Sequence, residues 1–284
     1  MPVVVPRSIE EAIQHLATDG ARCIAGGQSL VAMMNAGLLT PAVLVSLRDI
    51  DELKTITCDD AGLAIGAMVP HAVMAAYQPT FAGAALLVET ASKIGHPAIR
   101  NQGTIGGSVC HADPAADYPT ALVCADAVMT IAGPSGKRQV PAPEFFHGMF
   151  ETAVESGELL TAIAVPRTPD GTRVHYEKFA LIHGDFAAVS VASMIAMDDG
   201  VCSFARIAIG ACGSAPVRVR EAEHVLIGSS LDEAAITHSA NFLVAACDPI
   251  DDYRASAVYR LKLVPRLIRR AIDACVAKTE RADA

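Results

Sequence analysis

The chain has 284 residues, of which 52% are hydrophobic and 19% charged, a balance that excludes an intrinsically disordered protein and is ample for a buried core. Its 31 acidic residues outnumber its 22 basic ones and give a net charge of −9, so no global positive field would attract nucleic acid or an anionic membrane. No apolar stretch reaches the roughly 18 to 20 residues that span a bilayer, and we expect no transmembrane segment. The N-terminus has no secretory signal and the eight cysteines form no C-x-x-C pair, so we expect reduced thiols and a cytoplasmic location.

The first part of the chain predicts a small α/β unit. Ser8 begins a predicted helix that runs to residue 16, and Glu11 has the spacing of a capping box. Two apolar runs of strand length follow, at residues 21–25 and 43–47. We therefore expect a first subdomain over residues 1–55.

The middle of the chain predicts a larger unit of the α+β kind. Runs of strand length alternate here with helical stretches and turn signals. The expected strands cover residues 63–67, 128–132 and 160–165, and the expected helices cover residues 82–94 and 115–125. The turn-rich stretch 166–171 is the best candidate boundary, so we expect a second subdomain over residues 56–170.

The last part predicts three consecutive strands followed by helices, a separate α+β layer over residues 171–284. The expected strands cover residues 174–181, 187–197 and 201–211, and the expected helices cover residues 222–227, 231–246 and 256–276. Pro265 should kink or split the last helix. The basic side chains of this helix are expected to form a solvated face, with a docking surface for a partner as the alternative: Arg260, Lys262, Arg266, Arg269, Arg270 and Lys278.

Two glycine-rich segments stand out and are predicted to be loops, Ala25-Gly26-Gly27-Gln28-Ser29-Leu30 and Thr104-Ile105-Gly106-Gly107-Ser108. Adjacent glycines beside small polar side chains let backbone N–H groups approach a ligand closely. Either segment alone is explained more simply as a tight turn. The pair favours a diphosphate held from both sides, helped by the positive end of a following helix.

Familiar nucleotide and metal motifs are absent from the sequence. Gly136-Lys137 is followed by Arg138, so there is no P-loop, and no G-x-G-x-x-G of a Rossmann domain follows the early strand. His111 and Asp113 have no second His or Cys ligand at helical or hairpin spacing, so no metal site is predicted. No catalytic acid or base is predicted either.

The two glycine-rich segments belong to a wider set of motifs that resembles the FAD-binding medium subunit of molybdenum hydroxylases, the carbon monoxide dehydrogenase and xanthine dehydrogenase family. The resemblance covers nearly the whole chain. It rests on residues 25–30, 100–108, 111–117, 158–161, 176–178, 184–187 and 251–256. It implies an α+β chain with a two-subdomain FAD-binding fold (PCMH/vanillyl-alcohol-oxidase-like), followed by a C-terminal domain of a three-stranded antiparallel sheet with helices.

The resemblance also implies which residues bind the cofactor. The backbone amides of 25–29 and 104–108 would hold the FAD diphosphate, and Asp117 would accept hydrogen bonds from the ribityl hydroxyls. Leu160 would pack near the flavin. Lys178 would lie near the isoalloxazine, where a cation stabilises the reduced form. Without the resemblance, Asp117 and Lys178 would be ordinary solvated residues.

Two positions depart from the commonest family pattern. Position 28 is Gln28 where many carbon monoxide dehydrogenase relatives have His, and Gln occurs in relatives that hydroxylate N-heteroaromatic rings. The residue after Asp185 is Phe186 where many relatives have Tyr near the flavin, so a hydroxyl contact is missing there although the ring could still stack.

The function implied is an oxidoreductase subunit that transfers electrons. FAD, bound non-covalently, would receive electrons from the [2Fe–2S] clusters of a small subunit, which obtains them from a large molybdopterin subunit, and would pass them to an external acceptor. We expect a dimer of such heterotrimers, with molybdopterin and iron–sulfur clusters only on the partner subunits. A stand-alone flavin-dependent reductase of the same fold, or a scaffold whose diglycine segments are only turns, are the alternatives.

Overall fold

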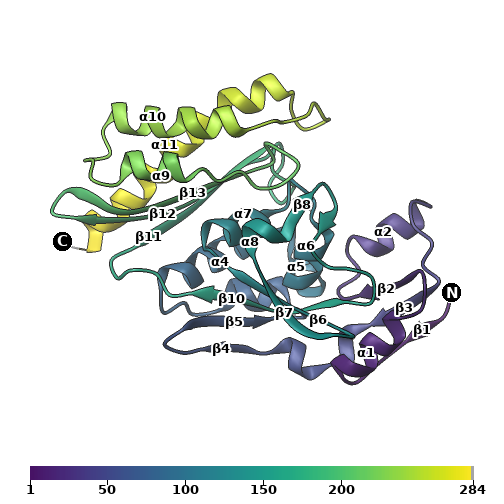
Figure 1. Cartoon of the computed structure of the whole chain (residues 1–284). Coiled ribbons are helices and arrows are strands. Elements are labelled where there is room, and N and C mark those ends of the chain that lie inside the picture. The colour runs from purple at the N-terminus through teal and green to yellow at the C-terminus, as the bar shows by residue number, and fades with distance from the viewer. Residues whose placement is uncertain (283–284) are drawn as a thin grey trace.

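The structure, a computed structural model, describes residues 1–282 and is built on three main sheets with helices between and around them (Figure 1). The first sheet is parallel, in the order β1 (Val3–Val4), β3 (Val43–Ser46), β2 (Ala21–Ile24). Parallel neighbours need crossover connections. These contain α1 (Ile9–Leu16) and α2 (Leu30–Asn35).

The start of α1 is capped as its sequence predicts. The Ser8 hydroxyl accepts a hydrogen bond from the Glu11 amide at 3.1 Å. The Glu11 carboxylate in turn accepts one from the amide of Arg7 at 2.8 Å, one residue earlier than in a standard capping box. Two short 3₁₀ turns, η1 (Leu47–Asp49) and η2 (Asp51–Lys54), lead to the second sheet.

The second sheet is antiparallel, and its middle strand comes last in the chain. The order is β4 (Ile56–Cys58), β5 (Gly62–Gly66), β10 (Leu159–Pro166), β6 (Val128–Gly133), β7 (Gly136–Pro141). Between β5 and β6 the chain forms α3 (His71–Ala76), α4 (Ala82–Ser92), α5 (Pro97–Gln102), α6 (Ile105–His111) and α7 (Asp117–Cys124). After β7 come α8 (Ala142–Phe145) and a small ladder of β8 (Phe146–Gly148) and β9 (Glu151–Thr152).

The third sheet is antiparallel, in the order β11 (Arg173–Phe179), β12 (Val189–Asp198), β13 (Val201–Gly210). Three helices cover one face: α9 (Arg220–Leu226), α10 (Glu233–Ala246) and α11 (Ala257–Ala282). Helices α4 and α7 cover the other (Figure 1). Val191 of β12 therefore packs with the C-terminal helices, whereas Ala192 joins the core of the second sheet. A strand buried on both faces has a continuous apolar sequence, as β12 does.

The structure corrects three of the sequence-based expectations. The stretch 104–108 is the cap and first turn of α6, not a loop. Helix α11 is not split at Pro265, because the apolar side chains on either side of it, including Val264 and Leu267, are buried against the third sheet. Arg260 does not belong to a solvated face, because only 3% of it is exposed.

Within residues 1–282, every helix is too short or too polar to cross a membrane. The eight cysteines are free thiols, and the side chains of four of them are buried.

Candidate functional site

The first diglycine segment connects the end of β2 to α2. Gly27 has a φ of +72°, a left-handed conformation that glycine adopts without steric cost. The side chain of Gln28 is exposed and donates a hydrogen bond to the carbonyl oxygen of Gly26 at 3.3 Å. Leu30 is the first residue of α2 and is half-buried, as is Ser29, the N-cap residue. The backbone of 25–29 therefore lies near the surface.

The second diglycine segment starts a helix. Thr104 is 4% exposed, and its hydroxyl accepts a hydrogen bond from the amide of Gly107 at 3.1 Å. Ile105 and Gly106 are buried, and a Cβ on Gly106 would lie 2.6 Å from the carbonyl oxygen of Ala67 at the end of β5. Gly106 is therefore a packing requirement. Gly107 is exposed and Ser108 half-buried, so only these two can face a ligand.

The two segments lie against each other. A Cβ on Gly26 would lie 2.0 Å from the carbonyl oxygen of Gln102 and 2.8 Å from Cα of Gly103. A Cβ on Gly107 would lie 3.6 Å from Cβ of Ala25. Only a residue without a side chain permits the first of these approaches. We call residues 25–29 and 104–108 together the diglycine seam.

The backbone amides of the seam differ in availability. Within the described part of the chain, those of 26–29 donate no backbone hydrogen bond. By contrast, the amide of Ile105 donates to Val69 at 3.0 Å and that of Gly106 to Ala67 at 2.9 Å. The first segment therefore presents donors for an anionic ligand, and the second uses its amides to hold α6 on β5.

Asp117 and Lys178 form one buried ion pair. The Lys178 ammonium donates to Asp117 Oδ2 at 2.9 Å and to the carbonyl oxygen of Lys93 at 3.2 Å, and the Tyr176 hydroxyl donates to Asp117 Oδ1 at 2.8 Å. The side chains of Asp117 and Lys178 are 5% and 6% exposed. Burial raises the pKa of Asp117, while Lys178 and Tyr176 oppose that shift. The alternative that both are ordinary solvated residues is wrong.

Leu160 lies in β10 with its side chain in the core of the second sheet, 3% exposed. Helix α6, whose first turn belongs to the seam, packs on this strand. A contact between its side chain and a flavin stays a prediction.

Asp185 and Phe186 lie in the loop 180–188, between β11 and β12, and both are exposed. The loop rests on the turn before α5, because a Cβ on Gly184 would lie 2.9 Å from the ring of His96. The Phe186 ring contacts the guanidinium of Arg254. The structure thus brings residues 25–29 together with 104–108, and Asp117 together with Lys178, while no measured contact joins Asp185 or Phe186 to either group.

Two residues that the sequence analysis did not single out support these groups. Tyr176 precedes Lys178 by two positions on β11, so both side chains point to the same face of the sheet, and this period of two was the available signal. His71 lies behind the second segment, since a Cβ on Gly103 would be 2.6 Å from its Nε2. Burial lowers the pKa of His71 to about 4, and no sequence pattern pointed to it.

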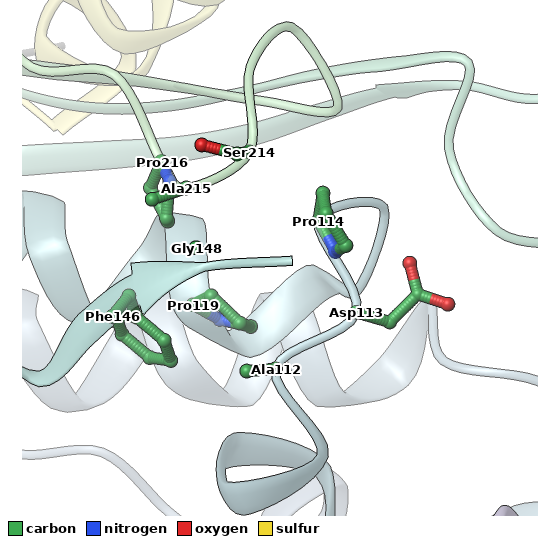
Figure 2. A pocket seen from close by; sticks show the side chains of 9 residues that line it. All are labelled: Ala112, Asp113, Pro114, Pro119, Phe146, Gly148, Ser214, Ala215 and Pro216. Atoms are coloured by element: carbon green, nitrogen blue, oxygen red, sulfur yellow. The ribbon is translucent and has the colours of Figure 1, made fainter. Parts of the chain in front are cut away.

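Two hollows were measured on the structure, and neither includes a residue of the predicted site. One is a shallow depression between the α6–α7 turn, β8 and residues 214–216, with no room for a water molecule and with the carboxylate of Asp113 turned away from Phe146 and Pro119 (Figure 2). Asp113 instead accepts a hydrogen bond from the amide of Ala115 at 2.8 Å and shapes the turn that leads to Asp117. The other, of about 430 Å³, lies at Asp126, Ala127, Pro141, Pro143, Glu144, Arg218 and Arg220. The predicted site therefore lies outside both hollows.

Among the described residues, no cluster of His, Cys, Asp and Glu could hold a metal ion. The donor set of the seam, backbone amides and hydroxyls, suits a diphosphate. Its open amides and the close approach at Gly26 therefore fit a dinucleotide better than a metal.

Comparison with known proteins relates both parts of the chain to one family. A family described as FAD binding domain in molybdopterin dehydrogenase matches residues 1–168. A second, described as CO dehydrogenase flavoprotein C-terminal domain, matches residues 174–275.

Individual relatives of the same family are similar to this chain over almost their whole length. The chain is 37% identical to the 6-hydroxypseudooxynicotine dehydrogenase complex subunit alpha of Paenarthrobacter nicotinovorans, covering 95% of this chain and 92% of that one. It is 36% identical to the carbon monoxide dehydrogenase medium chain of Afipia carboxidovorans, covering 97% and 96%. Its fold matches a chain of the cyanide-inactivated Cu,Mo-CO dehydrogenase crystal structure with a TM-score of 0.95 at 35% identity over 98% of each chain.

Proposed function

The chain belongs to the FAD-binding medium subunits of the molybdenum hydroxylases, the family of carbon monoxide and xanthine dehydrogenases, and we propose that it is the electron-transfer subunit of such a complex. It is an oxidoreductase subunit, and FAD is its cofactor. The observation that carries the proposal is the diglycine seam, where two distant segments meet and one of them has open amides.

The seam would hold the diphosphate of FAD. The amides of 26–29 would donate to its oxygens, with the hydroxyls of Ser29 and Ser108 beside them. Gly107 would form the opposite wall, because it is exposed next to Ala25. In a chain of net charge −9, such local donors are what an anionic ligand needs.

The Asp117–Lys178 pair would tune the cofactor. An ammonium group has three N–H donors, and two of those of Lys178 are used by Asp117 and Lys93. The third has no partner among the described residues and would donate to the flavin. Bound FAD supplies a carrier that takes up two electrons and releases them singly, and the positive charge of Lys178 stabilises the extra negative charge of the reduced ring. Asp117 and Tyr176 keep that charge in place.

The partners and the electron path complete the proposal. Electrons would come from molybdenum on a large subunit through the [2Fe–2S] clusters of a small subunit and leave for an external acceptor. The complex would be a dimer of heterotrimers in the cytoplasm, where its free thiols stay reduced. Gln28 supports an N-heteroaromatic substrate for the whole complex, and relatives named nicotine 6-hydroxylase and quinoline 2-oxidoreductase are 33% and 34% identical.

We further propose the division into residues 1–55, 56–170 and 171–284. The strands of the first, second and third sheets lie within the first, second and third of these ranges, respectively. Residues 283–284 lie outside the described residues.

The test is to purify the full chain with its partner subunits and to measure flavin and protein together. We expect a flavin absorption spectrum and equimolar FAD, released by acid denaturation because the seam offers no covalent tether. A folded, flavin-free complex would refute the proposal. Steady turnover by the purified single chain would favour the stand-alone reductase instead.

A further inference from the structure

The loop that carries Phe186 is backed by a short segment before α11. The guanidinium carbon of Arg254 lies 5.4 Å from the centre of the Phe186 ring and 4.5 Å from that of Tyr253. Both distances are within the range of cation–π contacts. One planar cation therefore joins two aromatic rings, of which Phe186 belongs to the loop 180–188.

Arg254 itself is held firmly. Its side chain donates to Asp252 Oδ2 at 2.9 Å, and its amide donates to Asp252 Oδ1 at 2.8 Å. Asp252 Oδ1 also accepts from the buried Arg260 at 2.5 Å. Arg260 donates further to the carbonyl oxygens of Ala188 and Ala211, at 2.6 and 2.9 Å. The same network thus fixes Arg254 and the end of the Phe186 loop.

Apart from the approach of Gly184 to His96, the middle of that loop has few restraints. Asp185 donates a backbone hydrogen bond to Ile182 at 3.1 Å, which is internal to the loop. The apolar residues Leu181 and Ile182 are more than half exposed, and Phe186 is 42% exposed. The Arg254 contact therefore joins the Phe186 ring to the segment before α11.

We propose that Arg254 is a positioning residue whose guanidinium, fixed by Asp252, holds the ring of Phe186 in place at the flavin site. The inference rests on the proposed function, because it takes from the family resemblance the expectation that FAD binds beside loop 180–188. Arg254 does not touch the cofactor in this role. Arg254 holds the exposed Phe186 ring in one orientation before FAD binds. The loss of side-chain entropy on ordering the ring therefore does not weaken FAD binding.

The first experiment titrates the flavin-free complex of the full chain and its partner subunits with FAD. Arg254→Met removes the cation but keeps much of the side-chain length, and we expect FAD to bind about two- to fivefold more weakly, the range that a partly exposed cation–π contact supports. Arg254→Lys keeps the charge beside Asp252 and is expected to fall between the wild type and Arg254→Met. The matched control is Arg266→Met, an exposed arginine on α11, which should bind FAD like the wild type.

The second experiment reports on the ring without needing FAD. The chain contains no tryptophan, so Phe186→Trp introduces a single fluorophore at the position in question. We expect the fluorescence anisotropy of this tryptophan to fall, and its quenching by acrylamide to rise, when Arg254→Met is added. FAD should quench it in the Phe186→Trp chain by energy transfer to the flavin.

The outcomes separate this inference from the proposed function. If the complex with wild-type chain binds no FAD, the proposed function fails, and the anisotropy still tests whether Arg254 orders residue 186. If FAD binds but Arg254→Met and Arg266→Met have equal affinities, Arg254 has no positioning role. Unchanged anisotropy on adding Arg254→Met overturns the inference as well. Should Arg254→Met fail to fold, the same comparisons are made with Arg254→Lys.

Discussion

The two diglycine segments, residues 25–29 and 104–108, each have two glycines near a hydroxyl side chain and lie against each other in the folded chain. Their glycines nevertheless have different roles. In the first segment Gly27 adopts a left-handed φ and the amides of 26–29 stay open. In the second, Gly106 is needed for packing on Ala67 and the amides hold α6 on β5. Similar sequences thus yield a ligand-facing segment and a supporting one. The difference teaches that the hydrogen-bond partners of a glycine-rich segment, more than its composition, decide what it can bind.

The largest expected effect comes from closing the contact between the two segments. Gly26→Ala would put a Cβ 2.0 Å from the Gln102 carbonyl oxygen, and we expect the unfolding free energy to fall by about 3 kcal/mol and equimolar FAD binding to be lost. Urea unfolding and FAD titration measure the two. Gly148→Ala is the control, because its Cβ would meet the Glu151 carboxylate at an ordinary 3.5 Å. Equal behaviour of the two variants would mean that the segments need not touch.

Lowering the pH should reduce the unfolding free energy through His71, which lies behind the second segment. The folded protein holds the pKa of this buried histidine at about 4, below the ordinary value of 6.5, so between pH 6.5 and 4 the unfolded chain binds more protons than the folded one. The contribution of His71 to the unfolding free energy is therefore fully present above pH 6.5. It is lost as the pH drops, by about 2 kcal/mol between pH 7 and 5.

The matched variant for the pH effect is His71→Leu, which removes the titrating ring. Urea unfolding at pH 7 and 5 should show a smaller loss in this variant by about 2 kcal/mol. An equal loss in both proteins would assign the acid sensitivity to another group.

The role of the left-handed turn at Gly27 in ligand binding is tested by comparison with Gly37, a glycine with the same backbone conformation outside the first segment. Gly27→Ala and Gly37→Ala both place alanine at a φ near +70°, and each should lose about 1 kcal/mol of stability. Only Gly27→Ala should also weaken FAD binding, by about tenfold, because it shifts the open amides. FAD titrations of the two variants give the comparison. If both bind FAD equally well, the first segment is not the ligand-facing one.

The smallest effect is expected where the second segment caps its own helix. Thr104→Val removes the acceptor of the Gly107 amide and should cost about 1 kcal/mol of stability, whereas Thr104→Ser should restore it. FAD affinity should change by less than about twofold, since the freed amide becomes available to the ligand. A large loss of affinity in Thr104→Val that serine rescues would place the hydroxyl in contact with the ligand.

Much of the fold could be predicted because its local signals are strong. The Ser8 cap, the strands and most of the helices follow from apolar periodicity and turn residues, and the α+β class with a three-stranded C-terminal sheet is confirmed. Helix α6 could not be found this way, because glycine disfavours a helix and only packing on Ala67 offsets that. Pro265 is tolerated for a similar reason, since tertiary contacts on both sides of it hold α11 together.

The candidate site was predictable only in part. Composition pointed to both diglycine segments, and their adjacency could be stated as a hypothesis. Which amides are free depends on Val69 and Ala67, which no motif connects to the segments. Asp117 and Lys178 were expected at different parts of the cofactor, and their pairing depends on how α7 packs on the third sheet across about sixty residues of chain. Contacts of this range are tertiary and leave no local pattern.

The position of β10 has a consequence for synthesis of the chain. This strand lies between β5 and β6, yet it is the last of its sheet to leave the ribosome. Until residue 166 has emerged, β5 and β6 each have an unpaired edge of the kind that promotes aggregation. Any nascent or truncated chain that ends before residue 159 should therefore depend on chaperones, and the flavin-binding half should be able to mature only once β10 has joined its two neighbours.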